Sequence, residues 1–438
     1  VFGCPYYNEF TSIKDTIFMK KEQFPQGFFW GAATAAHQVE GGNTNDWTEW
    51  EKRNADRLAR EAEKKFGHLP IWHDVKAQAQ DPENYISGRA CDHYNRYEED
   101  FDIAQSLGHT AHRFSIEWSR IEPREGEFDE KEIEHYKKVI TSLRACGIEP
   151  FVTLWHWPIP IWLKDKGGWR SGKVVEYFDR YTEKVALALK DDVKFWITLN
   201  EPLVYASHSY LKGAWPPQNK NPFYFILVVK NLLRAHRSAY RILKEVNPES
   251  HIGISAHNVY FEAYKGRFIN RLLKNIVDWL WNFLFFDFIK KYQDFIGLNN
   301  YHHNRINFGF NKNDNERISD MGWELYPEAL YRTLTGIKKY NKPVYVTENG
   351  LADREDKYRE WFIKENLKSV ARAIDEGVDV RGYLYWSLLD NFEWDKGFWP
   401  RFGLVEIDYN TMERKIRPSA RAYAEICKTN SLILDSNP

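Results

Sequence analysis

The sequence predicts an α/β protein folded as a single (β/α)8 TIM barrel. Short apolar runs of strand type alternate with longer amphipathic segments, a rhythm typical of parallel β-sheet with crossover helices. No Pro-, Gly- or Ser-rich linker divides the 438 residues. The chain also lacks a Gly-rich phosphate loop, which favours a closed barrel over a doubly wound nucleotide-binding sheet.

The elements alternate along the whole chain. Short runs centred on apolar residues predict strands at residues 28–33, 110–115, 150–155, 194–199, 251–256, 295–300, 343–347 and 381–387. Helical periodicity predicts helices at residues 94–107, 130–146, 174–189, 227–246, 326–340, 361–376 and 418–428. We therefore expect an N-terminal extension at residues 1–23, one barrel domain at residues 24–430 and a C-terminal tail at residues 431–438.

The charge balance excludes some partners. Lys and Arg number 61 and Asp and Glu 62, so the net charge is −1, which predicts neither a nucleic-acid nor a membrane partner. Aromatic residues make up 16% of the chain. They mostly fill protein cores, but their flat faces also suit a sugar ring, and composition alone does not decide between these roles.

The cysteines and the apolar stretches indicate a cytoplasmic protein. The four cysteines lie far apart without zinc-ligand spacing, so we expect neither a disulfide framework nor a metal site. The first 24 residues carry several charges and no long apolar run. The longest strongly apolar stretch, residues 279–289, is too short to span a bilayer.

Polar side chains follow six of the predicted strands directly, often beside an aromatic residue. In barrels of this type the chemistry lies at the carboxyl ends of the strands. The segments concerned are residues 34–42, 154–158, 198–202, 297–301, 345–350 and 386–394.

Glu201 and Glu348 are the strongest catalytic candidates, because each follows a predicted strand within two residues. Two carboxyl groups that face one cavity are what glycoside hydrolysis needs: one protonated acid and one anion. The structural alternative, that either Glu merely pairs with a nearby Arg such as Arg113, stays open for each residue alone.

The segments T-L-N-E-P at 198–202 and V-T-E-N-G at 346–350 resemble the two signatures of family 1 glycoside hydrolases, the retaining β-glycosidases. The resemblance covers nearly the whole chain. It includes the motifs at residues 24–42, 113–121, 386–394 and 401–405.

The resemblance implies a role for each matching position. Glu201 is expected to be the general acid/base and Glu348 the nucleophile, with Arg113 beneath the nucleophile to keep it ionised. The residues expected to bind the sugar are Gln38, His156, Asn200, Asn299, Tyr301, Trp386, Glu393 and Trp394. The implied activity is a retaining exo-β-glycosidase without a cofactor. Its expected substrates are small β-glucosides, and also galactosides or fucosides, or oligosaccharides.

Other functions remain open. Glu201 argues against a thioglucosidase, in which this position is Gln, and Glu393 argues against a 6-phospho-glycosidase, because its charge would repel phosphate. A sugar-binding barrel with little hydrolysis and a transglycosylase are the remaining alternatives. A homo-oligomer is also possible.

Two segments depart from clear patterns. Residues 46–92 carry no functional motif, and their charged part at residues 49–65 is interpreted as a solvated helix. Residues 260–294 are shorter than expected for the family and dense in apolar residues, which predicts a wider mouth or an apolar surface used for association.

Overall fold

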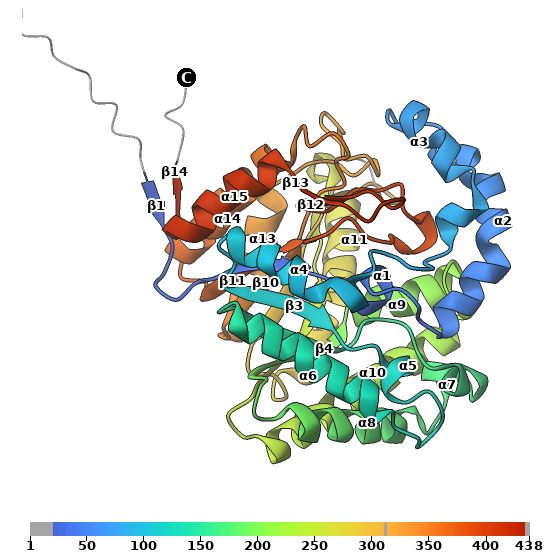
Figure 1. The fold of residues 1–438 in the computed structure, drawn as a ribbon. Coiled ribbons are helices and arrows are strands. Elements are labelled where there is room, and N and C mark those ends of the chain that lie inside the picture. The colour runs from blue at the N-terminus through green and yellow to red at the C-terminus, as the bar shows by residue number, and fades with distance from the viewer. Residues whose placement is uncertain (1–20, 311–312, 434–438) are drawn as a thin grey trace, which may run out of the picture.

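The computed structural model describes residues 21–310 and 313–433 and contains the predicted barrel (Figure 1). Eight parallel strands close in the order β10, β11, β2, β3, β4, β5, β6 and β8, and β8 pairs with β10. Their bounds are β2 Phe29–Ala33, β3 Ala111–Ser115, β4 Glu149–Trp155, β5 Phe195–Asn200, β6 His251–His257, β8 Ile296–Asn299, β10 Val344–Asn349 and β11 Val380–Trp386. All eight predicted strands are therefore confirmed.

Aromatic rings fill the barrel where the strands begin. Phe151 and Phe195 stack with their ring centroids 4.3 Å apart, and Phe29, Phe295 and Tyr345 pack around them. Close packing of this kind makes the interior of a (β/α)8 barrel a solid core. The carboxyl ends of the strands are left to carry the polar residues.

Helices surround the barrel in the predicted order (Figure 1). The helices correspond to the predicted ones and are α4 His93–Ser106, α6 Glu130–Ala145, α8 Val174–Leu189, α10 Pro222–Val246, α13 Glu328–Ile337, α14 Arg359–Asp375 and α15 Pro418–Thr429. Helix α10 begins before the predicted residue 227, because the side chain of Asn221 accepts hydrogen bonds from the backbone of Phe223 and Tyr224 and Pro222 occupies the first turn.

The interpretation of residues 49–65 as a solvated helix is only half right. Helix α2 Asp46–Phe66 is solvated on one side, but it buries Trp47, Trp50 and Leu58 on the other. Asn45 caps its first turn reciprocally with Thr48. Together with α3 Trp72–Ala79, this helix lies at the opposite edge of the fold from β1 (Figure 1).

Residues 260–294 form an ordered unit beside the barrel mouth. Strand β7 Tyr260–Ala263 pairs with β9 His303–Ile306, and α11 Phe268–Asp278 continues through the π-helical turn η5 Trp279–Phe283 into α12 Leu284–Ile289. The inner side of α11 packs on a small core of its own. That core contains Val259, Phe261 and Ile306, with Leu273, Val277 and Trp281 against it.

The two ends of the described chain meet. Strand β1 Lys21–Gln23 pairs antiparallel with β14 Ser431–Ile433. A second small ribbon is formed by β12 Val405–Ile407 and β13 Arg414–Ile416. Residues 1–20 and 434–438, which include most of the predicted extension and tail, lie outside the described residues.

No helix in the described part of the chain is both long enough and apolar enough to cross a membrane.

Candidate active site

Glu201 and Glu348 lie near each other at the carboxyl end of the barrel. Glu201 directly follows β5, and Glu348 lies in β10, paired in register with Asn299 of β8. The Nδ2 atom of Asn299 donates a hydrogen bond to Oε1 of Glu201 at 2.9 Å. The tertiary structure therefore brings together two carboxyl groups that are remote in sequence.

Glu348 is held as an ion-paired group. Nη1 of Arg113, from β3, donates to its Oε1, and the hydroxyl of Tyr301 donates to its Oε2 at 2.6 Å. Burial raises the pKa of Tyr301 well above its ordinary value, so the phenol stays protonated. Both carboxylate oxygens thus have a donor, and one of these donors is a cation.

The turn after Glu348 requires glycine. A β-carbon at Gly350 would lie 1.9 Å from the carbonyl oxygen of Trp386. The end of β10 therefore approaches the end of β11 more closely than any residue other than glycine at position 350 would permit.

Glu201 has the opposite environment. Its side chain is buried, and among the described residues only the amide of Asn299 donates a hydrogen bond to it. Burial, followed by repulsion from Glu348, raises the pKa of Glu201 well above its ordinary value. Its backbone is left-handed, with φ of 42°, a conformation that is uncommon for a residue other than glycine and is found at functional sites.

A buried amide network positions both carboxyl groups. Oδ1 of Asn299 accepts hydrogen bonds from Ser255 and Thr347, each at 2.7 Å, which leaves its amide nitrogen directed at Glu201. Nη2 of Arg113 donates to Oδ1 of Asn200 at 2.6 Å. Ser255 and Thr347 were not identified from the sequence, because a hydroxyl inside a predicted strand gives no signal of its own.

His156 and Gln38 present unused polar atoms. Nε2 of His156 lies 2.9 Å from the Asn200 amide, and burial, followed by the charge of Arg113, lowers the pKa of His156 well below its ordinary value. The amide of Gln38 donates to the carbonyl of Phe392 at 2.8 Å. Nδ1 of His156 and Oε1 of Gln38 are buried without a partner in the described structure, as expected of groups that wait for a ligand hydroxyl.

Trp386, Glu393 and Trp394 lie on the same side of the site. The rings of Trp386 and Trp394 both stack beside His156, at 6.0 and 6.1 Å between centroids. Burial raises the pKa of Glu393 to about 7, although Lys396 opposes this rise. The structure thus brings the predicted site residues together at the carboxyl ends of the barrel strands.

An aromatic cluster supports Trp394 and was not predicted from the sequence. His37 stacks on Trp394 at 5.6 Å, and Trp47 and Trp157 each lie 4.6 Å from it. The position of Trp157 directly after a strand was a usable signal. Trp47 comes from the first turn of α2, so this helix packs behind Trp394.

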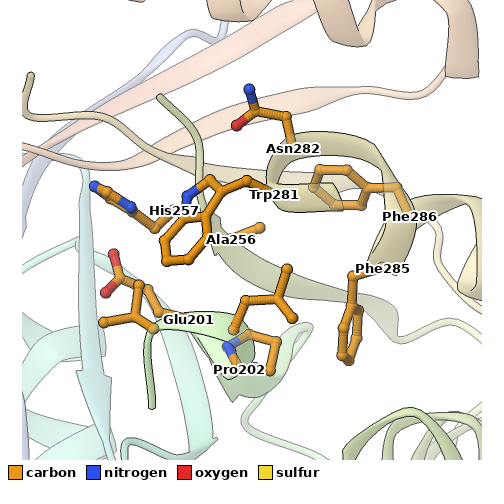
Figure 2. A pocket seen from close by; sticks show the side chains of 10 residues that line it. Glu201, Pro202, Ala256, His257, Trp281, Asn282, Phe285 and Phe286 are labelled. Carbon is orange, nitrogen blue, oxygen red and sulfur yellow. The ribbon is translucent and has the colours of Figure 1, made fainter. Parts of the chain in front are cut away.

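A second set of missed residues lies beyond Glu201. A small pocket is lined by Glu201, His257 and Trp281, and its far side is apolar, with Phe285 and Phe286 (Figure 2). Figure 2 shows the Trp281 ring beside His257, facing Glu201. His257 ends β6, so its position at a strand end was a signal in the sequence.

No cluster of three or more metal-binding side chains occurs among residues 21–310 and 313–433. Of the adjacent His302 and His303, the first is half-buried and the second buried, and desolvation lowers the pKa of both, to about 4 and about 3.

The arrangement combines a buried carboxyl group whose pKa is raised with a carboxylate paired to a cation. Such a pair can donate a proton from one group while the other acts as an anion. The buried amides and the indole faces around it match the polar edge and the apolar face of a pyranose.

Known proteins share this fold and sequence over nearly the whole chain. Beta-glucosidase A of Thermotoga maritima is 34% identical over 464 residues, covering 94% of this chain and 100% of the relative. Among solved structures, a beta-glycosidase from Pyrococcus horikoshii matches with a TM-score of 0.83 and 36% identity, covering 94% of this chain and 96% of its own. The Thermotoga maritima beta-glucosidase in complex with glucoimidazole matches with a TM-score of 0.82 and 32% identity, covering 93% and 99%.

The family model described as Glycosyl hydrolase family 1 matches residues 20–268 and 270–432. The resemblance noted in the sequence is therefore confirmed, and the chain is an O-glycoside hydrolase that belongs to glycosyl hydrolase family 1.

Proposed function

We propose that this protein is a retaining exo-β-glycosidase that removes terminal non-reducing β-D-glucosyl residues, and also β-galactosyl or β-fucosyl residues, from small glycosides. The observation that carries the proposal is the contrast between the two carboxyl groups. Glu348 is paired with Arg113, whereas Glu201 is buried beside an amide and has a raised pKa.

In the first step, the Glu348 carboxylate attacks the anomeric carbon and the bond to the leaving oxygen breaks. Glu201 gives its proton to that oxygen, so the aglycone leaves as an alcohol. In the second step, Glu201, now an anion, takes a proton from water, whose oxygen displaces Glu348 from the anomeric carbon. The sugar leaves with its configuration retained.

The remaining site residues are proposed to hold the sugar. Gln38, His156 and Glu393 offer polar atoms to its hydroxyl groups, and Trp386 and Trp394 offer flat faces. Asn200 is proposed to bind the 2-hydroxyl, a contact that strengthens in the transition state. The side-chain oxygen of Asn299 already accepts hydrogen bonds from Ser255 and Thr347. Its amide nitrogen is therefore free to orient Glu201.

The experiment is incubation with a 2,4-dinitrophenyl 2-deoxy-2-fluoro-β-glucoside. Fluorine slows both steps, but the good leaving group lets the first proceed, so a glycosyl-enzyme accumulates. We expect mass spectrometry to locate one sugar on the peptide that contains Glu348. Glu348→Gln should take up no label, whereas the exposed Glu406→Gln should react like the wild type.

Two other functions give different results in that experiment. A sugar-binding barrel with little hydrolysis would bind the fluoroglucoside without a covalent adduct. A transglycosylase would be labelled, but would release the sugar to an added sugar acceptor in preference to water. A panel of nitrophenyl glycosides would rank glucose, galactose and fucose.

A cytoplasmic location is also proposed. Cys91, Cys146 and Cys427 carry free thiols, and Cys91 and Cys427 are buried. Free buried thiols fit a reducing compartment. Fractionation of the source cells tests this.

A further inference from the structure

Helix α11 and the first residues of η5 expose a continuous apolar stripe. Phe268 is 80% exposed, Leu272 53%, Ile276 49% and Trp279 45%. Their spacing of three or four residues places them on one side of a helix. Ile269 and Leu280, which are 50% and 45% exposed, extend this side, and we name these six residues the α11 face.

The α11 face is separate from the packing of the helix against the protein. Leu273, Val277 and Trp281 form the inner stripe and pack on the core that β7 and β9 share. The outer stripe is therefore not needed to hold the helix in place. A soluble monomer rarely exposes so many large apolar side chains together without a binding role.

Helix α11 carries an excess of positive charge along most of the α11 face, whereas at its end Trp279 donates a hydrogen bond to Asp287 at 3.0 Å. Residues 264–277 contain Lys265, Arg267, Arg271 and Lys274 and no Asp or Glu. Lys274 pairs with Asp278 at 2.7 Å, whereas Lys265, Arg267 and Arg271 make no ion pair with any described carboxylate. The net charge of −1 for the whole chain, which predicted no membrane partner, conceals this local excess.

We propose that the α11 face docks on a lipid bilayer that carries anionic headgroups. Aliphatic and aromatic side chains on one side of a helix, flanked by Lys and Arg, are the composition of a helix that lies in a membrane interface. The apolar stripe enters the boundary between headgroups and acyl chains, and the unpaired cations meet the anionic headgroups.

A second copy of the chain suits this face less well. A two-fold symmetric contact would place the α11 face of one copy on that of the other. Arg267 and Arg271 of one copy would then lie near the same cations of its partner, and like charges disfavour such a contact.

Docking would place the bilayer near the pocket that Glu201 lines. Trp279 belongs to the same helical turn as Trp281, whose ring faces Glu201 across the pocket (Figure 2). The bilayer surface would therefore lie beside the wall of the candidate active site.

The test is flotation of the full chain with vesicles of phosphatidylcholine alone or with added phosphatidylserine. We expect binding to the anionic vesicles and release at high ionic strength. The double variant Phe268→Ser, Leu272→Ser should lower the vesicle partition coefficient at least about tenfold. Arg267→Glu with Arg271→Glu should remove the preference for anionic vesicles.

Matched controls test whether losing any exposed apolar or cationic side chain lowers vesicle binding. Leu187→Ser on α8, where the side chain is 54% exposed, and Arg53→Glu on α2 should bind vesicles like the wild type. All four variants should hydrolyse aryl glucosides at the wild-type rate without lipid, which shows that they are folded. Glu348→Gln should still bind vesicles, so failure of the proposed hydrolysis is distinguishable from failure of docking.

Two outcomes would overturn the proposal. One is a wild-type protein that stays unbound, or that binds no more strongly than the Phe268→Ser, Leu272→Ser variant. The other is that this variant only changes the elution volume in lipid-free gel filtration, which would assign the face to contact between copies.

Discussion

Arg113 joins Glu348 to Asn200, the residue next to Glu201. One of its terminal nitrogens donates to the Glu348 carboxylate and the other to the Asn200 amide oxygen at 2.6 Å, and all three side chains are buried. A buried guanidinium depends on such acceptors, because water does not reach it. The same cation therefore influences the charge of one catalytic candidate and the position of the segment that carries the other.

Replacing Arg113 should affect both stability and the pH profile. Arg113→Met leaves Glu348 buried without its cation, which should lower the free energy of unfolding by about 3 kcal/mol. The variant also removes the positive charge that favours the anionic form of the proposed nucleophile, so the acidic limb of kcat/KM against pH should move to higher pH. Urea unfolding and the pH profile of aryl glucoside hydrolysis measure the two effects. An unmoved acidic limb would contradict the assigned role.

The effect of replacing Glu201 should depend on the leaving group of the substrate. Glu201→Gln removes the proton donor, so hydrolysis of alkyl glucosides should slow by about a thousandfold. Formation of the intermediate from dinitrophenyl glucoside should change far less, because that leaving group needs no proton. Because the pKa of Glu201 is raised, the wild type should lose activity as pH rises through it, and the variant should lack this alkaline limb. Equal losses on both substrates would refute the role of Glu201.

The hydroxyl of Tyr301 donates to Glu348 at 2.6 Å. Tyr301→Phe keeps the ring and removes this bond, a change worth about 1.5 to 3 kcal/mol for a charged acceptor. We expect kcat to fall by about ten- to a hundredfold. Tyr383→Phe, which removes a 2.7 Å bond to Asn349 in the same region, is the matched control and should alter stability more than kcat. The comparison needs steady-state kinetics and thermal unfolding of both variants.

The buried pair of Asp390 and Arg417 should make stability depend on pH. Burial alone would raise the pKa of Asp390, but Arg417 at 2.9 Å, with Arg401, brings it below its ordinary value. A lowered folded pKa means that the stabilisation is complete above the unfolded pKa and is lost as pH falls through the folded value. Asp390→Asn should cost about 3 kcal/mol at neutral pH and less in acid.

Urea unfolding at several pH values measures this difference. The exposed pair of Arg124 and Glu127 supplies the control, because its side chains are 78% and 64% exposed. Glu127→Gln should change the free energy of unfolding by less than about 1 kcal/mol at every pH. A constant cost of Asp390→Asn across pH would show that the pair is not ionised as described.

Several parts of the fold could be predicted because local signals agree with the tertiary structure. The eight strands are short apolar runs, and a strand buried on both faces needs such a run wherever it lies in the barrel. The start of α10 was missed because Asn221 and Pro222 act through capping, which apolar periodicity does not record. The buried side of α2 was missed because the charged residues of this helix dominate the average hydropathy of the segment.

The site residues also divide into those that the sequence could identify and those that it could not. Residues at strand ends, such as Glu201 and His156, could be found from position and type. Trp47 and Ser255 could not, because they reach the site through packing and a hydrogen bond with residues far along the chain.

The order of elements, the two acidic residues and the family resemblance were determined by the sequence alone, since each depends on neighbouring residues or on a short motif. Only the tertiary structure decided that Glu348 faces Arg113 while Glu201 faces an amide. The reason is that ionisation depends on burial and on charges within a few ångströms, and barrel closure alone sets those distances.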